Sequence, residues 1–398
     1  MALATGLFNA NLNPAELNMR SFAANILRLF PNGSAPLFAM SSQSGKASAK
    51  STTHGYFSKT MTFISQSPTA QVLVGGTTIL VTSTAGMVEG MVLFNRTTRE
   101  NVRITDVVSA VELTVTRAFG RIAAVQMETT ETLIAVGTAY EEGSVRPTPR
   151  RLTTVYVPNY TQIFRNAWAL TDSARASMAE AGISNIQENR QDCSLFHAAD
   201  AEAAILYGQP KMDTTGTSPI HATQGIIDAI EQYAPANTNT AASTTTFAQL
   251  VALVEPAFQY STDMSNPKER VIFGDSQAIK VINDIGRLSG VVQIMNKQTT
   301  FGMNFTQFGF YKGTVNLIEH PLMNGMGATG LAVVMDMAAL KLAYLEGRDT
   351  KLEEYGTGGK IVESGVDSVG GSLTTEFAVE LTNPFSCAVV YGLTAGAA

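Results

Sequence analysis

The chain has 398 residues, of which 45% are hydrophobic and 15% are charged. This is the composition of a globular protein long enough for two or three packed units. No stretch approaches the ~20 apolar residues of a membrane-spanning helix, and Cys193 and Cys387 are the only cysteines, so the sequence excludes a helical membrane protein and a disulfide-rich secreted scaffold. The start of the chain also lacks the basic residues of a secretion signal, and we expect a cytosolic product.

Charge is distributed unevenly along the chain. Residues 1–60 hold five basic side chains and one acidic side chain, a net charge of +4, whereas residues 151–398 hold 15 basic and 24 acidic side chains, a net charge of −9. Tight binding of nucleic acid needs clustered Lys and Arg, so the acidic body is not expected to grip DNA. Two interpretations of the basic N-terminal region remain open, a solvated tail or an arm that docks on the acidic body of a neighbouring subunit.

A helix is predicted near the N-terminus. Asn13 is a capping residue, Pro14 suits the first helical turn, and apolar residues then recur at helical spacing until Pro31. The segment 41–53 has no large apolar side chain and is predicted to be a flexible connection. A short apolar helix on such a tether needs a packing partner, which is either its own body or another subunit.

From Thr60 to Gly137 the pattern changes to short strands with period-two alternation. Val102 and Ile104, for example, alternate with polar residues, and glycine-containing turns separate the runs. This pattern predicts a small β-module. The exit that follows, Arg146–Arg151, is polar and contains two prolines, so it is predicted to be a stiff arm that projects from the body.

The rest of the chain reads as a mixture of helices and strands. Helices are predicted over Asn185–Tyr207, with Cys193, Phe196 and Ala199 on the core side, over Gln224–Tyr233, and over Phe247–Tyr260 with a kink at Pro256. Strands are predicted at Arg270–Phe273, Val315–Glu319, Leu331–Met335, Leu340–Leu345, Glu376–Leu381 and Phe385–Tyr391.

The most enzyme-like feature is the strand, turn and helix around Asp275 and Ser276. It imitates the tight turn that presents a nucleophilic serine in hydrolases. The alternative is that Asp275 or Ser276 caps the helix Gln277–Asp284 by accepting hydrogen bonds from its first N–H groups. A hydrolase of this type also needs an acid and then a histidine, and only His320 lies downstream.

No metal or cofactor site is predicted. None of the four histidines forms a closely spaced pair with another; they are His54 in the linker, His197, which we expect to be a hydrogen-bonded structural group, His221 and His320. The run Gly356–Lys360 resembles a phosphate loop, but Ile361 stands where the magnesium-binding Ser or Thr belongs. We therefore expect no catalytic, cofactor-binding or metal-binding residues.

Several segments, taken in order, resemble the major capsid proteins of tailed bacteriophages. They are Ala139–Gly143, Asn159–Arg165 with Trp168–Thr171, Glu202–Gly208, and a C-terminal run through Glu376–Leu381, Asn383–Phe385 and Tyr391–Leu393. The resemblance implies an α+β fold of the Hong Kong 97 type. Its expected parts are an N-terminal arm (1–53), an extended β-loop (54–151) with a β-insertion at about 71–137, a peripheral domain with a spine helix (152–210), a mainly axial domain with return strands (211–365), and terminal strands of the peripheral domain (366–398).

The same resemblance implies a structural function and no enzyme activity. The chain would assemble with itself into pentamers and hexamers of an icosahedral head, in the host cytoplasm, and would enclose double-stranded DNA without sequence-specific binding. Portal, scaffolding or decoration proteins would be further partners, and no membrane would be involved. Two alternatives stay open: an encapsulin-like nanocompartment shell protein, and a Ser276-dependent hydrolase.

Overall fold

The computed structural model describes residues 46–59, 63–177, 185–261, 269–289, 295–300, 303–355 and 367–396. The helix predicted after Asn13 and the glycine-rich run 356–360 lie outside the described residues. The chain divides into two compact units. One combines the residues up to Tyr56 with those from Pro158 onward, and the other is Phe57–Val157, which lies close to the range 54–151 in which the extended loop was predicted.

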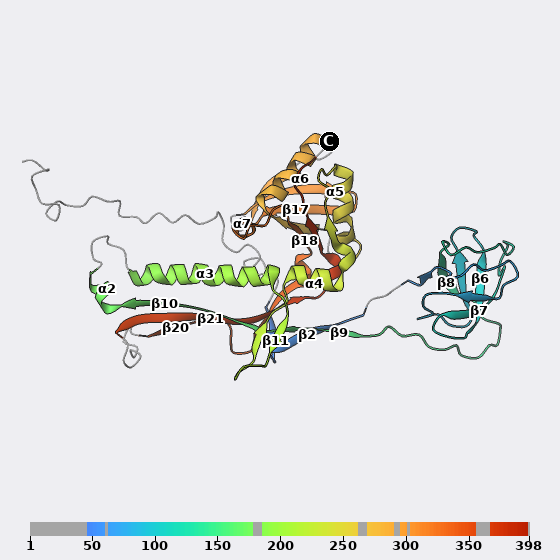
Figure 1. Ribbon diagram of the computed structural model, residues 1–398, viewed down its shortest axis with the longest axis horizontal. Coiled ribbons are helices and arrows are strands. Elements are labelled where there is room, and N and C mark those ends of the chain that lie inside the picture. The colour runs from blue at the N-terminus through green and yellow to red at the C-terminus, as the bar shows by residue number, and fades with distance from the viewer. Residues whose placement is uncertain are drawn as a thin grey trace, which may run out of the picture. The chain divides into compact units, whose positions relative to one another are not determined.

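The first unit contains a five-stranded sheet in the order β1-β19-β21-β10, with β20 also paired to β21. Its strands are β1 (Lys46–Ala49), β10 (Gln162–Thr171), β19 (Leu340–Leu345), β20 (Lys351–Tyr355) and β21 (Ser368–Leu381). The long helix α3 (Asn185–Tyr207) runs along β10 and β21 (Figure 1). Its bounds are those predicted from the sequence.

The same unit contains a seven-stranded sheet in the order β13-β22-β18-β14-β17-β16-β15. Its strands are β13 (Thr238–Thr240), β14 (Glu269–Gly274), β15 (Met295–Thr300), β16 (Met303–Phe310), β17 (Gly313–Glu319), β18 (Ala332–Met335) and β22 (Ala388–Tyr391). Helices α5 (Phe247–Val254) and α6 (Ser276–Ser289) share one core with Ile272 of β14. Phe273, the next residue, enters a second core with α3 and α4 (Ile226–Tyr233). Both faces of β14 are therefore buried, which explains why it reads as a continuous apolar run.

Short elements complete this unit. They are α2 (Asp172–Ser177), β11 (Lys211–Asp213), β12 (Ile220–Ala222), α7 (Pro321–Gly325) and the 3-10 helices η4 (Pro235–Asn237), η5 (Glu255–Phe258), η6 (Met337–Ala339) and η7 (Pro384–Ser386). The interruption predicted at Pro256 is confirmed, because α5 ends at Val254 and the chain continues as η5. At the other end of α5, Thr246 and Gln249 form a reciprocal capping box.

The prediction of a flexible connection over 41–53 is wrong for Lys46–Ala49. These residues form β1, which pairs in parallel with β19. Ala49 is fully buried in a small cluster with Ala343 and Ala378. Because β1, β19 and β21 all contribute small alanine side chains here, β1 packs closely against the sheet. The absence of a large apolar residue in β1 therefore reflects this close packing and not flexibility. His54 likewise lies in a strand, β2 (Thr53–Ser58), and not in a linker.

The buried stripe of α3 also differs from the prediction. Its buried residues are spaced by four and include Cys193, His197, Ala201 and Ile205. Phe196, expected on the core side, is 59% exposed. His197 is the hydrogen-bonded structural group that the sequence predicted, since its Nδ1 lies 2.8 Å from Asn166 Oδ1 and its Nε2 lies 2.8 Å from Thr375 Oγ1.

The two C-terminal strands enter different sheets, although the sequence grouped them as terminal strands of one domain. β21 pairs with β10, β19 and β20. β22 pairs with β13 and β18 in the seven-stranded sheet. Between them the chain passes through η7, which begins at Pro384. The segment from β21 to β22 therefore connects the two sheets of this unit.

The unit Phe57–Val157 is built on a six-stranded sheet in the order β3-β8-β5-β6-β7-β4. Its strands are β3 (Ser65–Gln66), β4 (Thr78–Leu80), β5 (Met91–Asn95), β6 (Asn101–Val107), β7 (Glu112–Thr116) and β8 (Leu133–Thr138). A bridge between Pro68 and Val81 joins the two ends of this order, so the sheet closes on itself as a small barrel. Val102 and Ile104 are fully buried within it, as their alternation predicted. The barrel has a core of its own.

Candidate assembly surfaces

The turn around Asp275 and Ser276 is present, and the capping interpretation is confirmed for Asp275. Its Oδ1 accepts a hydrogen bond of 3.2 Å from the N–H of Ala278, in the first turn of α6. The same carboxylate accepts the N–H groups of Gly330 and Leu331 at 3.0 Å each. Asp275 is buried and thereby ties the start of α6 to the segment before β18. Its role is structural.

The histidine that a hydrolase would need is engaged elsewhere. His320 is fully buried; its Nε2 lies 2.6 Å from Glu202 Oε1, and its Nδ1 accepts a hydrogen bond from the N–H of Met323. Ser276 Oγ instead donates to the carboxylate of Glu319. Because both ring nitrogens of His320 already have partners and neither is Ser276, this arrangement supplies no general base of the kind a serine triad requires.

Metal binding finds no support in the described part of the chain. There, no three His, Cys, Asp or Glu side chains come together in a group that could hold a metal ion. The two cysteines are both buried, and burial raises the pKa of the Cys387 thiol to about 11, so this thiol is unreactive at neutral pH.

Large apolar side chains are exposed where the chain enters and leaves the barrel unit. β2 pairs there with β9 (Val155–Tyr160) in a two-stranded ribbon. Phe57 is 73% exposed and Val155 is 56% exposed. The ring of Tyr156, itself 45% exposed, lies 5.1 Å from that of Phe57. Exposed apolar groups gathered in this way are typical of surfaces that another protein covers.

A polar hollow of about 300 Å³ lies on the five-stranded sheet. Ile163 and Arg165 of β10 and Lys351 of β20 line it, with Arg348 and Asp349 beside them. In β10 the residues that alternate with Ile163 and Arg165 are buried or half-buried, so the hollow lies on the side of the strand opposite that core. Mixed charges around an exposed Ile are suited to a contact with a protein surface.

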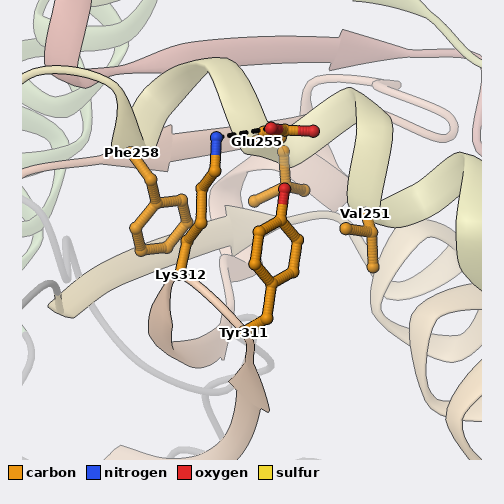
Figure 2. Close-up of a pocket in the computed structure, with 6 residues that line it drawn as sticks. Val251, Glu255, Phe258, Tyr311 and Lys312 are labelled. Carbon is orange, nitrogen blue, oxygen red and sulfur yellow. Dashed lines mark hydrogen bonds and ion pairs between the residues drawn. The ribbon is translucent and has the colours of Figure 1, made fainter.

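A third surface lies between η5 and the turn that joins β16 to β17 (Figure 2). Lys312 donates a hydrogen bond to the carboxylate of Glu255, and this bond raises the pKa of Lys312 and lowers that of Glu255. Tyr311 projects beside the pair and is 73% exposed. Aromatic side chains are enriched in protein interfaces, so the exposed ring of Tyr311 suits a contact with another protein.

None of these surfaces was predicted residue by residue. The strands that carry Phe57, Ile163 and Tyr156 were not predicted, and the sequence does not show which face of a strand its own body leaves uncovered. The proline-containing exit Arg146–Arg151 is different, because its polar sequence and two prolines predicted that it projects from the body. Every residue from 145 to 152 is indeed exposed and outside helices and strands.

Solved structures share only a loose overall likeness with the chain. The capsid protein of Myoviridae phage XM1 is 8% identical with a TM-score of 0.47, covering 97% of this chain and 99% of that chain. A protein of Mycobacterium phage Bobi is 13% identical with a TM-score of 0.47, covering 96% and 97%. The SrpI encapsulin of Synechococcus elongatus PCC 7942 is 12% identical with a TM-score of 0.43, covering 62% and 80%.

Two comparisons of the sequence with known proteins establish the family of this chain. The model of the SU10 major capsid protein family matches residues 4–394. The major capsid protein of Pseudomonas phage PaMx41 is 49% identical over 405 residues, which cover 99% of this chain and 97% of that protein. These matches support the expected α+β capsid fold and leave the nanocompartment and hydrolase alternatives with less support. The chain therefore belongs to the SU10 major capsid protein family, and it is a structural, non-enzymatic capsid subunit of a phage.

Proposed function

We propose that this chain closes an icosahedral head through pentamers and hexamers of one subunit type. Residues 1–53 act as an arm that is anchored to the body through β1, and 54–151 act as an extended loop that carries the barrel as its insertion. Residues 152–210 form the peripheral domain and 211–365 mainly the axial domain, while 366–398 supply one strand to each of the two sheets. Arms and loops overlap neighbouring subunits, so that many weak contacts close the shell cooperatively.

The observation that carries this proposal is the apolar surface of the ribbon at the barrel entry. Fully burying a side chain such as Phe57 contributes about 1.5–3 kcal/mol, and at 73% exposure most of this gain is unrealised within the chain. Val155 and Tyr156 add to the same surface. A neighbouring subunit that covers these residues would supply the missing burial, which favours assembly over the isolated chain.

The charge of the body supports DNA as cargo. Residues 151–398 hold 15 basic and 24 acidic side chains, so the shell would enclose double-stranded DNA without binding it tightly. Assembly would take place in the host cytoplasm, with portal, scaffolding or decoration proteins as further partners. In the described residues, no helix has the length and hydropathy of a membrane span.

The test is to express the full chain and examine it by light scattering and negative-stain microscopy. We expect closed shells, with DNA rather than enzyme cargo when they form during infection. Packaged enzyme would favour the nanocompartment. A small soluble oligomer whose ester turnover disappears in Ser276→Ala would favour the hydrolase and overturn the proposal.

The ribbon surface is tested by Phe57→Ser. This variant should fold normally, because Phe57 is mostly exposed, and should form markedly fewer shells at a given concentration. Val136→Ser is the matched control, since Val136 is a 58% exposed strand residue of the barrel, away from the ribbon in sequence. Equal assembly of the two variants would remove the ribbon from the proposal.

A further inference from the structure

The barrel exposes charged side chains of opposite sign at its two ends. β6 spans the barrel, so the turn before this strand and the turn after it lie at opposite ends. Arg117 directly follows β7 and pairs with Glu100 in the turn before β6, so the loop after β7 belongs to the same end as that turn. The exposed charged residues of this end, here called the arginine end, are one glutamate, Glu128, and three arginines, Arg96, Arg99 and Arg121.

The turn after β6 forms the acidic end. The N–H of Thr84 donates a hydrogen bond of 2.9 Å to the carbonyl oxygen of Ala110, so residues 80–90 lie beside this turn. The segments 80–90 and 105–113 contain no lysine or arginine. Their acidic residues are Glu89 and Asp106, which are exposed, and Glu112, which is half-buried.

The exposed charges of the two ends are available to a partner. Within the part of the chain that the structure describes, none of them takes part in an ion pair. Each end also exposes large apolar side chains. At the arginine end Leu73 is 64% exposed and Val74 is 54% exposed, and at the acidic end Val108 is 53% exposed and Val111 is 48% exposed. Apolar groups gathered beside charged ones are typical of surfaces that another protein covers.

The apolar surface of the arginine end is held in place by the buried ion pair. Arg117, whose guanidinium pairs with Glu100, donates from Nη1 to the carbonyl oxygen of Leu73 at 3.1 Å and from Nη2 to the carbonyl oxygen of Val125. Val125 is itself 45% exposed. Because one side chain fixes both segments, this surface loses little conformational freedom when a partner covers it.

We propose that the arginine end of one barrel docks on the acidic end of the barrel in a second copy of this chain. The charges are complementary, since three arginines and one glutamate would face three acidic residues. Both ends also carry exposed apolar side chains, and their burial against each other favours the contact. The inference rests on the proposed function and deepens it, because it assigns a contact that the barrel insertion makes.

Such a contact is heterologous, because each barrel presents one end to one neighbour and the opposite end to the next. A heterologous contact closes into a ring when the rotation between subunits completes a circle. Barrels joined in this way would form a ring on each pentamer and hexamer of the shell. The ion pairs are exposed to solvent, so each is weak and screened by salt, and repetition around the ring strengthens the whole.

The first test joins the two ends chemically within assembled shells. Val74→Cys and Val111→Cys, placed together in the full chain, put one exposed thiol at each end. The native Cys193 and Cys387 are buried, so they give little background. A short bismaleimide links neighbouring thiols without the strict geometry that a disulfide requires. We expect a ladder of covalent products that extends beyond the dimer to the pentamer and hexamer on a denaturing gel.

Single variants and their mixture test the direction of the contact. Val74→Cys alone and Val111→Cys alone should remain monomeric on the gel, because equal ends do not meet. Shells assembled from a mixture of these two chains should give covalent dimers and nothing larger. Val74→Cys combined with Ile220→Cys is the matched control, because Ile220 is 69% exposed but belongs to β12 of the other unit.

Reversing the charges tests the electrostatic part of the contact. In the chain with both cysteines, Arg96→Glu combined with Arg121→Glu should lower the cross-linked fraction about tenfold, a change equivalent to about 1.4 kcal/mol. Glu89→Arg combined with Asp106→Arg should act alike, and a chain with all four substitutions should recover the ladder. Loss of shells in either pair, with recovery in the four-fold variant, would support the inference equally. The matched control reverses two exposed acidic residues outside both ends, Glu141→Arg and Glu142→Arg.

Several results would overturn the inference while leaving the proposed function intact. Shells could form without any ladder, which would leave the two ends to a partner other than this chain, or the ladder could stop at the dimer. The single variants could cross-link to themselves, or the charge reversals could leave the ladder unchanged. Failure of the wild-type chain to form shells would instead contradict the proposed function.

Discussion

His54 Nε2 lies 2.7 Å from Glu380 Oε2, and this pair fixes β2 to β21. The two side chains are 19% and 13% exposed. Lys341 of β19 stands opposite Glu380 in the antiparallel ladder. The hydrogen bond from His54 lowers the pKa of Glu380, against the opposing effect of burial, and the charges of His54 and Lys341 lower it further. The first residues of the ribbon are therefore held to the body electrostatically.

We predict that this attachment weakens in acid. Because the pKa of Glu380 is lower in the folded protein than its ordinary value of 4.5, its contribution to stability is complete above that value and is lost as the pH falls through the folded pKa. Glu380→Gln should lower the free energy of unfolding by about 1 kcal/mol at pH ~6 and by less at pH ~3. Denaturant titration at both pH values measures this, with the exposed Glu346→Gln as control. An unchanged difference at the two pH values would contradict it.

A second prediction concerns the glycine pair in β21. A Cβ atom at Gly371 would lie 2.7 Å from the carbonyl oxygen of Glu353 and 2.9 Å from Trp168 Nε1. Gly371→Ala must therefore displace a backbone atom, and it should destabilise the protein by about 1–3 kcal/mol. Gly309→Ala is the control, because that strand glycine has open space around it. Trp168 is the only tryptophan, so fluorescence during urea unfolding measures the effect directly.

A third prediction concerns the alanine contact that holds β1. Ala49 is fully buried against Ala343 and Ala378, so Ala49→Leu inserts volume where none is available. We expect a loss of about 1–3 kcal/mol in the free energy of unfolding. The adjacent Ser48 is exposed, and Ser48→Leu should change stability little. Protease cleavage near residue 50 would report release of β1, and equal resistance of the two variants would contradict the packing argument.

β1 is an element that the local sequence does not predict. The bounds of α3 and β19 were predicted from the local sequence as the structure has them, although the buried side of α3 was not. The strand that contains Ala49 has no strong local pattern. It depends on packing against Ala343 and Ala378, which lie about 300 residues further along the chain. The exposure of Phe196 was missed for a related reason: several apolar stripes were possible on α3, and only its packing against β10 selects among them.

Sheet membership could not be predicted either. β21 and β22 have similar alternation, yet one pairs with β10 and the other with β18, and these pairings are set by contacts distant in sequence. The assembly surfaces have the same limitation, because exposure of Phe57 or Ile163 depends on what the rest of the body covers. The polar exit Arg146–Arg151 is an exposed segment that composition alone could identify.

The last prediction concerns the buried ion pair of the barrel. Glu100 is fully buried, and Arg117 donates to both of its carboxylate oxygens, from Nε at 2.8 Å and from Nη2 at 2.7 Å. Burial raises the pKa of Glu100, but the hydrogen bonds from Arg117 and from the N–H groups of Ala118 and Val125 outweigh burial and lower it overall. Glu100→Gln would leave the buried guanidinium without its counter-charge, which costs about 3–5 kcal/mol.

Because the barrel has its own core and Trp168 lies in the other unit, this loss should be local. Glu100→Gln should unfold at lower urea by circular dichroism, and limited proteolysis should cut first within Phe57–Val157, while Trp168 fluorescence keeps its wild-type midpoint. Glu128→Gln, an exposed barrel residue, is the control. A fluorescence midpoint that shifts together with the circular dichroism would show that the two units unfold as one, and the barrel would then not be an autonomous insertion.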